Sequence, residues 1–433
     1  MKKTISWLLL VLLLLVGCTA KAPTAEEKIP VNVSVQPKSA TEAPVDIKEE
    51  GNMPQQNEPA KDPAVSGYED FMSLLSAAVI DGKGNKNLSP VSVYLALTMA
   101  AEGAQGDTQA ELLALLGEKD MEELRRKAQA MLEALVVTGR TGELDLANSI
   151  WLGTQDETVK FQKAFLKVLA DSYGANAEGV PFGKAEAGER IAAWIREKTK
   201  DKVKISEDAM RFDADTLAVL LNTIYLKDGW RKPFDKDYTE NGPFHGLDGQ
   251  ELQVAYMRQT DSDGFIFRGS GYLRYSMPLN DVGNVVFVLP DEGVSLDSLL
   301  GSPEKIRELL HGGEKVPAIV NIKLPKFTFQ DRTDLEQIMM DLGVITCFTD
   351  NADFSAMTDT PAHISRVLQE SCIGMDEDGV VAAAYTMVAM AKSSISLDER
   401  EKVDFHLTRP FLYAIERWDG TVLFIGTVVA PVE

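Results

Sequence analysis

Apolar residues recur at intervals of three and four over six segments in the first half of the chain, a period that predicts amphipathic helices. Local signals mark several ends of these segments. Ser89 stands before a proline at the first helical position, Thr108 and Glu111 form a capping box, and Gly117 is a typical stop. The predicted helices span residues 68–79, 90–102, 108–116, 121–136, 161–173 and 187–199.

Between and after these helices the chain carries shorter runs rich in Val, Ile, Leu, Phe and Tyr, which are typical of strands. The last two runs flank Trp418, Asp419 and Gly420, a turn signal that predicts a hairpin. Helices first and strands later, without regular alternation, favour a mixed α+β domain over a doubly wound sheet. The predicted strands cover residues 144–152, 217–226, 272–279, 285–289, 319–329, 411–415 and 421–428.

One run, from residue 380 to residue 391, contains neither a charge nor a proline. In a central strand one face must meet a core, so alternate side chains cannot be charged and no residue can be proline; at a period of two, neither face of this run carries a charge. An acidic segment that ends in glycine, residues 376–379, precedes the run. Together these features indicate a strand that can enter a sheet from outside. An ordinary buried strand or an Ala-rich helix is the alternative interpretation of the run alone.

The first residues have the composition of an export signal, because Lys2 and Lys3 precede an apolar run over residues 7–16. The run is shorter than the roughly 20 residues of a transmembrane helix. Residues 15–18 resemble the lipobox of bacterial lipoproteins, which implies cleavage before Cys18 and attachment of lipid to this residue. A plain signal peptide is the alternative.

Residues 19–65 are rich in Pro, Glu, Lys, Gln and Ala, and they contain no Phe, Tyr or Trp. A segment of this composition cannot bury a core, so it predicts a disordered tether. Scattered prolines and charges make such a tether semi-extended. The folded domain is predicted at residues 66–433, which are enough for a large core.

Charge and motif content argue against several classes of function. The formal net charge of −22 and the lack of basic clusters argue against a nucleic-acid partner. The four histidines make no metal-ligand spacing, neither a GxSxG elbow nor a P-loop occurs, and no cofactor is expected. A hydrolase that pairs His363 or His406 with Ser365 or Ser393 is a remote alternative.

Two cysteines lie in the folded region, Cys347 and Cys372, each with apolar neighbours in the sequence. This setting is more typical of buried thiols than of a disulfide framework. Export of the chain leaves a single bridge between them open.

Short motifs are spread over residues 66–433, and their order is far more specific than any one of them. They are Asn87-Leu88-Ser89-Pro90-Val91-Ser92, Gly103-Ala104-Gln105-Gly106-Asp107-Thr108, Ala147-Asn148-Ser149-Ile150, Leu221-Asn222-Thr223-Ile224-Tyr225-Leu226-Lys227 with Trp230 and Phe234, Leu324-Pro325-Lys326-Phe327, Asp334-Leu335 with Leu342-Gly343-Val344, Ala352-Asp353-Phe354-Ser355, the acidic segment with its uncharged run, and Arg409-Pro410-Phe411 with Phe424-Ile425-Gly426. Together these motifs resemble the serpin family over essentially the whole folded region.

The resemblance implies one α+β domain with three β-sheets, eight or nine helices and an exposed reactive loop. It also implies an inhibitor and not an enzyme. A protease attacks the loop as a substrate, forms an acyl-enzyme, and is trapped when the freed loop inserts into the central sheet. The hinge that this implies consists of Glu377, Gly379, Val380, Val381, Ala382, Ala383, Ala384 and Thr386.

The reactive bond that the resemblance implies depends on the length of the hinge. A standard length places the bond between Ser393 and Ser394. The bond after Lys392 is the alternative, and it suits a trypsin-like protease whose pocket offers a carboxylate. Because the loop is somewhat longer than usual, Ile395 and Ser396 also remain open.

A second set of matches lies under the central strands. Ser89, Ser92 and Asn222 match a polar cluster that controls the parting of these strands in serpins, and Gln369 stands where the family usually has histidine. Gln donates and accepts hydrogen bonds but does not titrate. We therefore expect sheet opening to depend little on pH near neutrality. Helix capping by Ser89 is the alternative role for that residue.

A third set, Trp230, Lys326 and Glu377, matches contacts that hold the loop outside the sheet. The expected interaction is a hydrogen-bonded ion pair between Lys326 and Glu377. Trp230 is expected beside this pair.

The function predicted from the sequence is a suicide-substrate inhibitor of serine proteases, trypsin-like or subtilisin-like, with cysteine proteases as a further target class. The protein is expected to be exported and monomeric, and to be anchored by lipid on Cys18 in a bacterial cell envelope, outside the cytoplasm. The alternative is a non-inhibitory binding or scaffold lipoprotein of the same fold. The uncharged hinge favours the inhibitor, because a buried unpaired charge would stall insertion.

Overall fold

The computed structural model describes residues 63–137, 142–154, 156, 159–201, 210, 212–214, 216–364, 367–380 and 400–432. All of them belong to one compact unit within Asn32–Glu433. Several predicted features lie outside the described residues: the signal at 1–18 with Cys18, nearly all of the tether at 19–65, the hinge residues Val381, Ala382, Ala383, Ala384 and Thr386, and the reactive bond at Lys392, Ser393 and Ser394.

The central helix, α2, spans Pro90–Gly103 and follows directly from its composition. It carries no charge before Glu102, and twelve of its fourteen residues are buried. A helix that is apolar on every side belongs in a protein core. In agreement with this rule, α2 lies against strand β4 of one sheet and strand β15 of the other.

The six predicted helices are all confirmed, with ends that differ by a few residues. Helix α1 begins at Pro63, slightly before the predicted start of the domain. Among the described residues no helix is both long and apolar enough to cross a membrane. The eight α-helices of the described part are α1 Pro63–Val79, α2 Pro90–Gly103, α3 Gly106–Leu115, α4 Met121–Ala134, α5 Lys163–Tyr173, α6 Ala185–Lys198, α7 Pro303–His311 and α8 Glu336–Asp341.

The predicted capping box of α3 is wrong, because Thr108 and Glu111 both lie inside the helix. The hydroxyl of Thr108 accepts a hydrogen bond from the backbone N–H of Asp353 at 2.9 Å. The Glu111 carboxylate accepts from the backbone N–H of Thr346 at 2.7 Å. A tertiary contact with the segment after α8 has therefore taken the place of local capping.

Nine strands form one sheet in the order β1-β15-β14-β8-β7-β6-β9-β13, with β5 paired to β6 off this path. The 19-residue β6 pairs with β5 and β9 and, at its end, with β7. The resemblance implies three sheets, whereas the described residues form two, because the long β6 joins β5, β9 and β7 into one sheet. The strands are β1 Lys86–Leu88, β5 Glu240–His245, β6 Glu251–Gly269, β7 Tyr272–Pro278, β8 Gly283–Pro290, β9 Glu314–Pro325, β13 Glu401–His406, β14 Phe411–Arg417 and β15 Val422–Val428.

The other sheet has six strands in the order β10-β11-β12-β4-β2-β3. The run predicted as one strand at residues 319–329 is two strands, β9 and β10, which separate at Lys326 and belong to different sheets. The strands of this second sheet are β2 Glu143–Gly153, β3 Asn176–Val180, β4 Ala218–Gly229, β10 Phe327–Asp334, β11 Leu368–Met375 and β12 Gly379–Val380.

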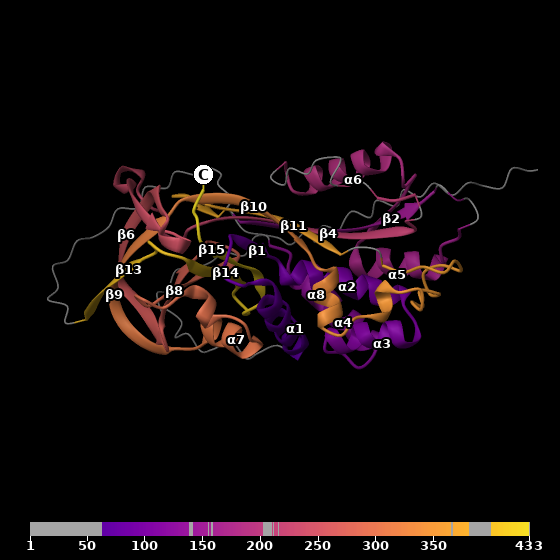
Figure 1. The fold of residues 1–433 in the computed structure, drawn as a ribbon, viewed down its shortest axis with the longest axis horizontal. Helices are drawn as coiled ribbons and strands as arrows, with labels where there is room; N and C mark the ends of the chain where they lie inside the picture. Colours follow the sequence, from indigo (N-terminus) through magenta and orange to yellow (C-terminus); the bar gives the residue numbers. More distant parts are fainter. Residues whose placement is uncertain are drawn as a thin grey trace, which may run out of the picture. The chain divides into compact units, whose positions relative to one another are not determined.

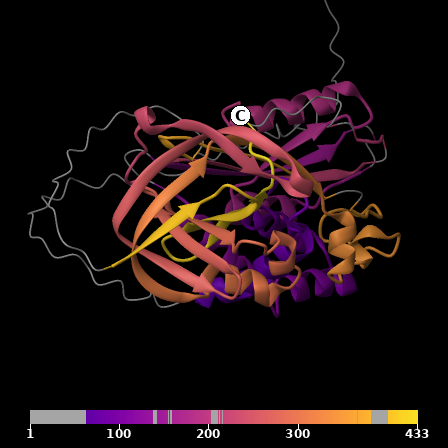
Figure 2. The ribbon, with the colours of Figure 1, turned by 60° about the vertical axis from the view of Figure 1, so that its left-hand side comes forward.

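Helices cover both faces of the six-stranded sheet. Figure 1 shows α6 above strands β2 and β4, with α2 and α5 below them. Trp194 of α6 packs edge-on against Trp151 of β2, with ring centroids 6.2 Å apart. Strands β6, β9 and β13 curve together at the other end of the unit, as Figure 2 shows. The central strand β4 thus lies between α6 and α2.

Candidate functional site

The six-stranded sheet is parted at its centre. The two-residue strand β12 lies between β11 and β4, with Val380 opposite Met375 on one side and Asp228 on the other. All three of these side chains are buried. Beyond this point, no backbone pairing joins β4 to β11 among the described residues. The inner edges of two neighbouring strands are therefore available for a further strand.

A cavity of about 140 Å³ lies between the parted strands. Its walls come from β4, from β11 and from the underlying helix α2, and most of them are apolar. A strand that enters here meets an apolar floor, which accepts small uncharged side chains without a desolvation penalty. The principal lining groups are residues 217–223, residues 367–370, and Ser92, Val93, Ala96, Leu97 and Ala100.

A tight turn leads from β11 into β12. The Asp376 side chain accepts hydrogen bonds from the backbone N–H groups of Asp378 at 2.9 Å and Gly379 at 3.2 Å. The Trp230 indole N–H donates to the Asp376 carbonyl at 2.8 Å, and Trp230 is 1% exposed. A Cβ at Gly379 would lie 2.1 Å from the Asp228 carbonyl oxygen, so only glycine allows this close approach.

Glu377 is held by two partners from outside the turn. Lys326 lies 3.1 Å from one carboxylate oxygen, and the Thr239 hydroxyl donates to the other at 2.8 Å. Glu377 itself is 5% exposed. Burial alone would raise its pKa, but the hydrogen bonds from Thr239 and Lys326 lower the pKa below its ordinary value. The expected pair of Lys326 and Glu377 is present beside Trp230, and its role in holding the loop out stays a prediction.

Acid should weaken this contact. Because the pKa of Glu377 is lowered in the folded protein, its stabilisation is complete above the ordinary value of 4.5 and is lost as the pH falls through the lowered value. We expect the Glu377→Gln variant to be less stable than wild type by about 1–3 kcal/mol at pH 7, with the difference shrinking as the pH falls below 4.5. Urea midpoints from pH 3 to pH 7 measure it. A difference that is constant over this range would contradict the assignment.

Sequence reasoning missed three residues at this end of the gap. Asp228 is 2% exposed and accepts hydrogen bonds from the backbone N–H groups of Asp281 and Val282 at 2.8 and 2.7 Å. Burial raises the pKa of Asp228 despite these donors. Thr239 holds Glu377, and Lys236 pairs with Asp378 at 2.9 Å. Each of these contacts is distant in sequence, so no local pattern could have indicated it.

The predicted polar cluster is only partly assembled. The Ser89 hydroxyl donates to the Ser92 hydroxyl at 3.0 Å, and the Gln369 amide donates to the Ser89 carbonyl at 3.4 Å. Asn222 turns instead to its cross-strand neighbour Asn148, to which its amide donates at 2.6 Å. The alternative role of Ser89 is half right, because it occupies the N-cap position of α2 but makes no side-chain cap.

Two acceptors of this cluster have no donor among the described residues. They are the side-chain oxygens of Asn222 and Gln369, and both residues line the cavity between the strands. A buried acceptor without a donor costs about 1–3 kcal/mol. Before a strand enters the gap, the sheet therefore carries two unsatisfied acceptors that an incoming hydroxyl or amide could satisfy.

A histidine at position 369 should make sheet opening depend on pH. Gln369 is 8% exposed and does not titrate, whereas a histidine there would gain a charge below its ordinary pKa of about 6.5. Heating is expected to drive loop insertion or polymerisation. We expect the rate of this loss of monomer to change between pH 6 and pH 8 in Gln369→His, by a factor at least about threefold larger than in wild type. Native gels of heated samples measure it. His363 also lines the cavity, so His363→Gln in both backgrounds is the control.

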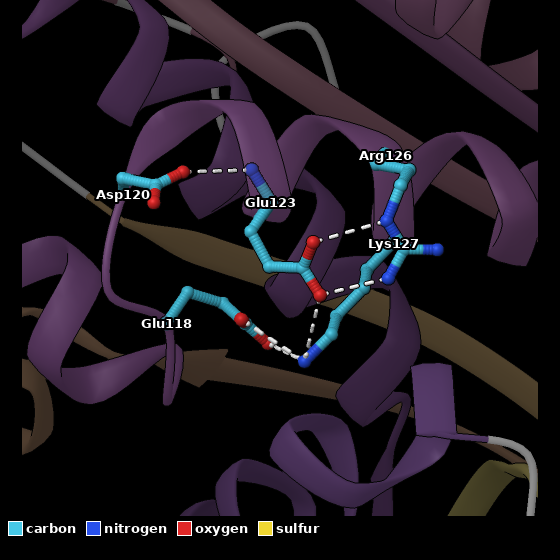
Figure 3. Close-up of polar contacts among 5 residues, drawn as sticks. All are labelled: Glu118, Asp120, Glu123, Arg126 and Lys127. Atoms are coloured by element: carbon cyan, nitrogen blue, oxygen red, sulfur yellow. Dashed lines mark hydrogen bonds and ion pairs between the residues drawn. The ribbon is translucent and has the colours of Figure 1, made fainter.

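The one basic triplet of the predicted helices, Arg125-Arg126-Lys127 in α4, is neutralised within the fold. Arg126 pairs with Glu123 at 2.7 Å, and Lys127 pairs with Glu118 at 2.7 Å (Figure 3). Arg125 pairs with Glu102 at 2.6 Å. Each cation of the triplet is therefore paired with a carboxylate of the same fold.

The cysteines and histidines are dispersed. No disulfide joins Cys347 and Cys372, and burial raises the pKa of the Cys347 thiol to about 12. Within the described ranges, no group of three His, Cys, Asp or Glu side chains is placed to hold a metal ion. His363 and His406 lie 4.0 Å from Asp350 and Asp404, respectively. Their imagined serine partners lie outside the described residues, so this alternative gains no support.

Comparison with known proteins adds independent evidence. Residues 67–431 match the family model described as serpin, a serine protease inhibitor. The chain is 30% identical to Serpin A11 of Rattus norvegicus over 80% of this chain and 83% of that protein. It is 28% identical to Serpin-Z1C of Triticum aestivum over 83% of this chain and 93% of that protein.

Solved structures agree with these sequence matches. Serpin48 of the insect Tenebrio molitor, described as highly specific, matches with a TM-score of 0.74 at 27% identity, over 85% of this chain and 98% of that one. The thermophilic serpin tengpin in its native state matches with a TM-score of 0.73 at 26% identity, over 88% and 96%. Such matches support a general role as a protease inhibitor. Because the family model covers most of its length, the chain belongs to the serpin family.

Proposed function

We propose that this protein is a suicide-substrate inhibitor that traps serine proteases by inserting its cleaved loop between β4 and β11. The target cleaves the loop at Ser393-Ser394 or after Lys392 and remains bound as an acyl-enzyme. The freed loop enters the parted sheet and carries the protease with it. Cysteine proteases, which also form acyl-enzymes, are a further target class.

One observation carries this proposal: Gly379 and Val380 already occupy the first two positions between β11 and β4. Continuing their register by single residues sets position 382 opposite Leu226 and Ile373. Four more residues set Thr386 between Asn222 and Gln369, the two residues with unsatisfied acceptors. The loop sequence thus offers a hydroxyl at the position where the cavity lacks a donor.

Insertion must outrun hydrolysis of the acyl-enzyme, and enzymes commonly turn over at roughly 1–1000 per second. The loop should therefore meet no barrier as it enters. Positions 380, 382 and 384 are Val, Ala and Ala, which bury without a polar cost. About twelve inserted residues would add a ladder of hydrogen bonds with a net gain on the order of 10 kcal/mol. This gain is available only after the loop is cut.

We also propose that the inhibitor acts outside the cytoplasm, tethered through lipid on Cys18. The support is the sequence alone: a charged start, a short apolar run and a small residue before the cysteine. Residues 19–65 would then hold the inhibitor away from the membrane surface. Replacement of Cys18 by Ser should release the protein from membranes into the soluble fraction of an expressing bacterium.

The test is to incubate the purified full-length protein with trypsin, subtilisin, chymotrypsin and elastase. We expect at least one complex that survives boiling in detergent, and mass spectrometry of the released C-terminal peptide should identify the bond. Clean cleavage without a complex for every protease would overturn the proposal. It would favour the non-inhibitory binding or scaffold protein instead.

A further inference from the structure

Three basic residues form one row across the nine-stranded sheet. Arg258 of β6 is the register partner of Lys323 of β9, and Lys323 is the register partner of His406 of β13. Residues that face each other in this way share one face of a sheet. They line a hollow of about 610 Å³, together with Tyr238 and other polar residues.

Lys323 lies at the centre of this row, and its charge is poorly satisfied. Its ammonium sits 4.1 Å from the centre of the Tyr256 ring, and it has no ion pair or hydrogen bond with any residue that the structure describes. Burial, followed by the nearby Arg258, lowers the pKa of Lys323. Burial also lowers the pKa of His406. Asp404 opposes this shift, whereas Lys323 and Arg258 lower the pKa further. An incoming anion would relieve this repulsion.

The carboxylates at the edge of the hollow are already engaged. Glu240 lies 3.1 Å from Arg258, and Asp404 accepts a hydrogen bond from the Asn321 amide at 2.8 Å. Glu240 offsets part of the lowering of the Lys323 pKa, but neither carboxylate forms an ion pair with Lys323 among the described residues, and both repel a long polyanion. The hollow is thus suited to a short acidic segment presented by a protein surface, and less to a long polyanion such as nucleic acid.

The hollow also has the position and composition of a docking surface. Tyr238 is 64% exposed at its edge, and exposed Tyr beside Arg is typical of residues that dominate binding energy in interfaces. Thr239, next to Tyr238, holds Glu377 at the hinge. Strand β13 begins at Glu401, a short distance in sequence after the predicted reactive bond, and carries His406 at its other end. A protease bound to the loop would therefore lie near this face.

We propose that this hollow, centred on Lys323, docks an acidic segment of the protease that attacks the loop. The inference rests on the proposed function for the identity of the partner. It gives the inhibitor a second point of recognition besides the reactive bond. Electrostatic docking of this kind raises the association rate more than it changes the trapping step.

The first test uses hexaglutamate as a probe of the full-length protein, measured by calorimetry at low ionic strength. We expect binding that weakens about tenfold or more in Lys323→Gln and that fades when salt shortens the screening length. Lys315→Gln is the matched control, because Lys315 lies on the same strand with its ammonium 4.3 Å from the Phe265 ring centre. The proposal would be overturned if wild type does not bind hexaglutamate. It would also be overturned if Lys323→Gln and Lys315→Gln lose affinity for the peptide equally.

NMR provides an independent readout, since the chain has only four histidines. The pKa of His406 should rise when hexaglutamate binds to wild type and should not respond to the peptide in Lys323→Gln. The peptide should leave the NMR signals of the other three histidines unchanged. A response of His406 that persists in Lys323→Gln would place the peptide elsewhere and count against the hollow.

The second test compares rates of complex formation with a protease that the wild type traps. Lys323→Gln should slow association about fivefold or more at low salt, leave the stoichiometry of inhibition unchanged, and converge with wild type at high salt. If Lys323→Gln associates with the protease as fast as wild type at low salt, the protease is not the partner that docks at the hollow. If wild type traps no protease, the proposed function and its partner fail together, whereas binding of hexaglutamate that depends on Lys323 would still identify a site for acidic segments.

Discussion

Ala382→Glu is expected to convert the inhibitor into a substrate, so that proteases cleave the loop and leave. In the register set by β12, position 382 falls opposite Leu226 and Ile373, which are 3% and 1% exposed. A carboxylate buried there without a partner costs several kcal/mol. About 3 kcal/mol added to the insertion barrier slows insertion roughly 150-fold, which lets hydrolysis of the acyl-enzyme win.

The measurement is the number of inhibitor molecules consumed for each protease trapped, read from titrations and denaturing gels. Val381→Glu is the matched control, since it introduces the same side chain one residue earlier and therefore on the opposite face. After insertion in the register of β12, position 381 would fall opposite Lys227 and Gly374, and Lys227 is only half-buried. We expect Val381→Glu to trap nearly as well as wild type.

Two results would count against this account of insertion. Efficient trapping by Ala382→Glu would mean that the residue does not enter the sheet in the register of β12. Equal failure of both variants would mean that charge anywhere near the hinge blocks the reaction. In either case the gap between β4 and β11 would not be the place where the loop inserts in the register of β12.

Helix α2 could be predicted from the sequence because its composition already indicates a buried helix: it carries no charge before Glu102. Prediction from the sequence failed for β6, whose 19 residues include Asp261 and Asp263. These acids sit where β6 is irregular, between its pairing of Asp261 with Val320 and that of Gly264 with Ala318. Sheet geometry there overrides the alternation from which strands are predicted.

The candidate site shows a similar division. The pair of Lys326 and Glu377 could be named only through the family resemblance, because 51 positions separate the two residues. Asn222 was expected beside the serines, yet its register places it opposite Asn148, and its amide bonds there. Register between distant strands is set by tertiary packing, so it cannot be read from either strand alone.

Glu377→Lys should promote premature loop insertion or polymerisation on mild heating. Glu377 is 5% exposed, and its carboxylate lies 3.1 Å from Lys326. The variant would bring two ammonium groups together and leave the Thr239 hydroxyl without its acceptor. Breaking a buried ion pair in this way costs about 3–5 kcal/mol, all of it at the contact that holds the turn before β12. Native gels and size-exclusion chromatography of heated samples measure the loss of monomer.

Asp378→Lys is the control variant that distinguishes the loss of the buried ion pair from a general effect of the added charge. It makes the same change one residue away, but there the partner is the exposed Lys236, and an exposed pair contributes only about 0–1 kcal/mol. It should therefore stay monomeric under conditions that polymerise Glu377→Lys. Adding Lys326→Glu to Glu377→Lys restores opposite charges and should recover most of the monomer. Unchanged monomer in Glu377→Lys, or a double variant no better than the single one, would show that another contact holds the hinge.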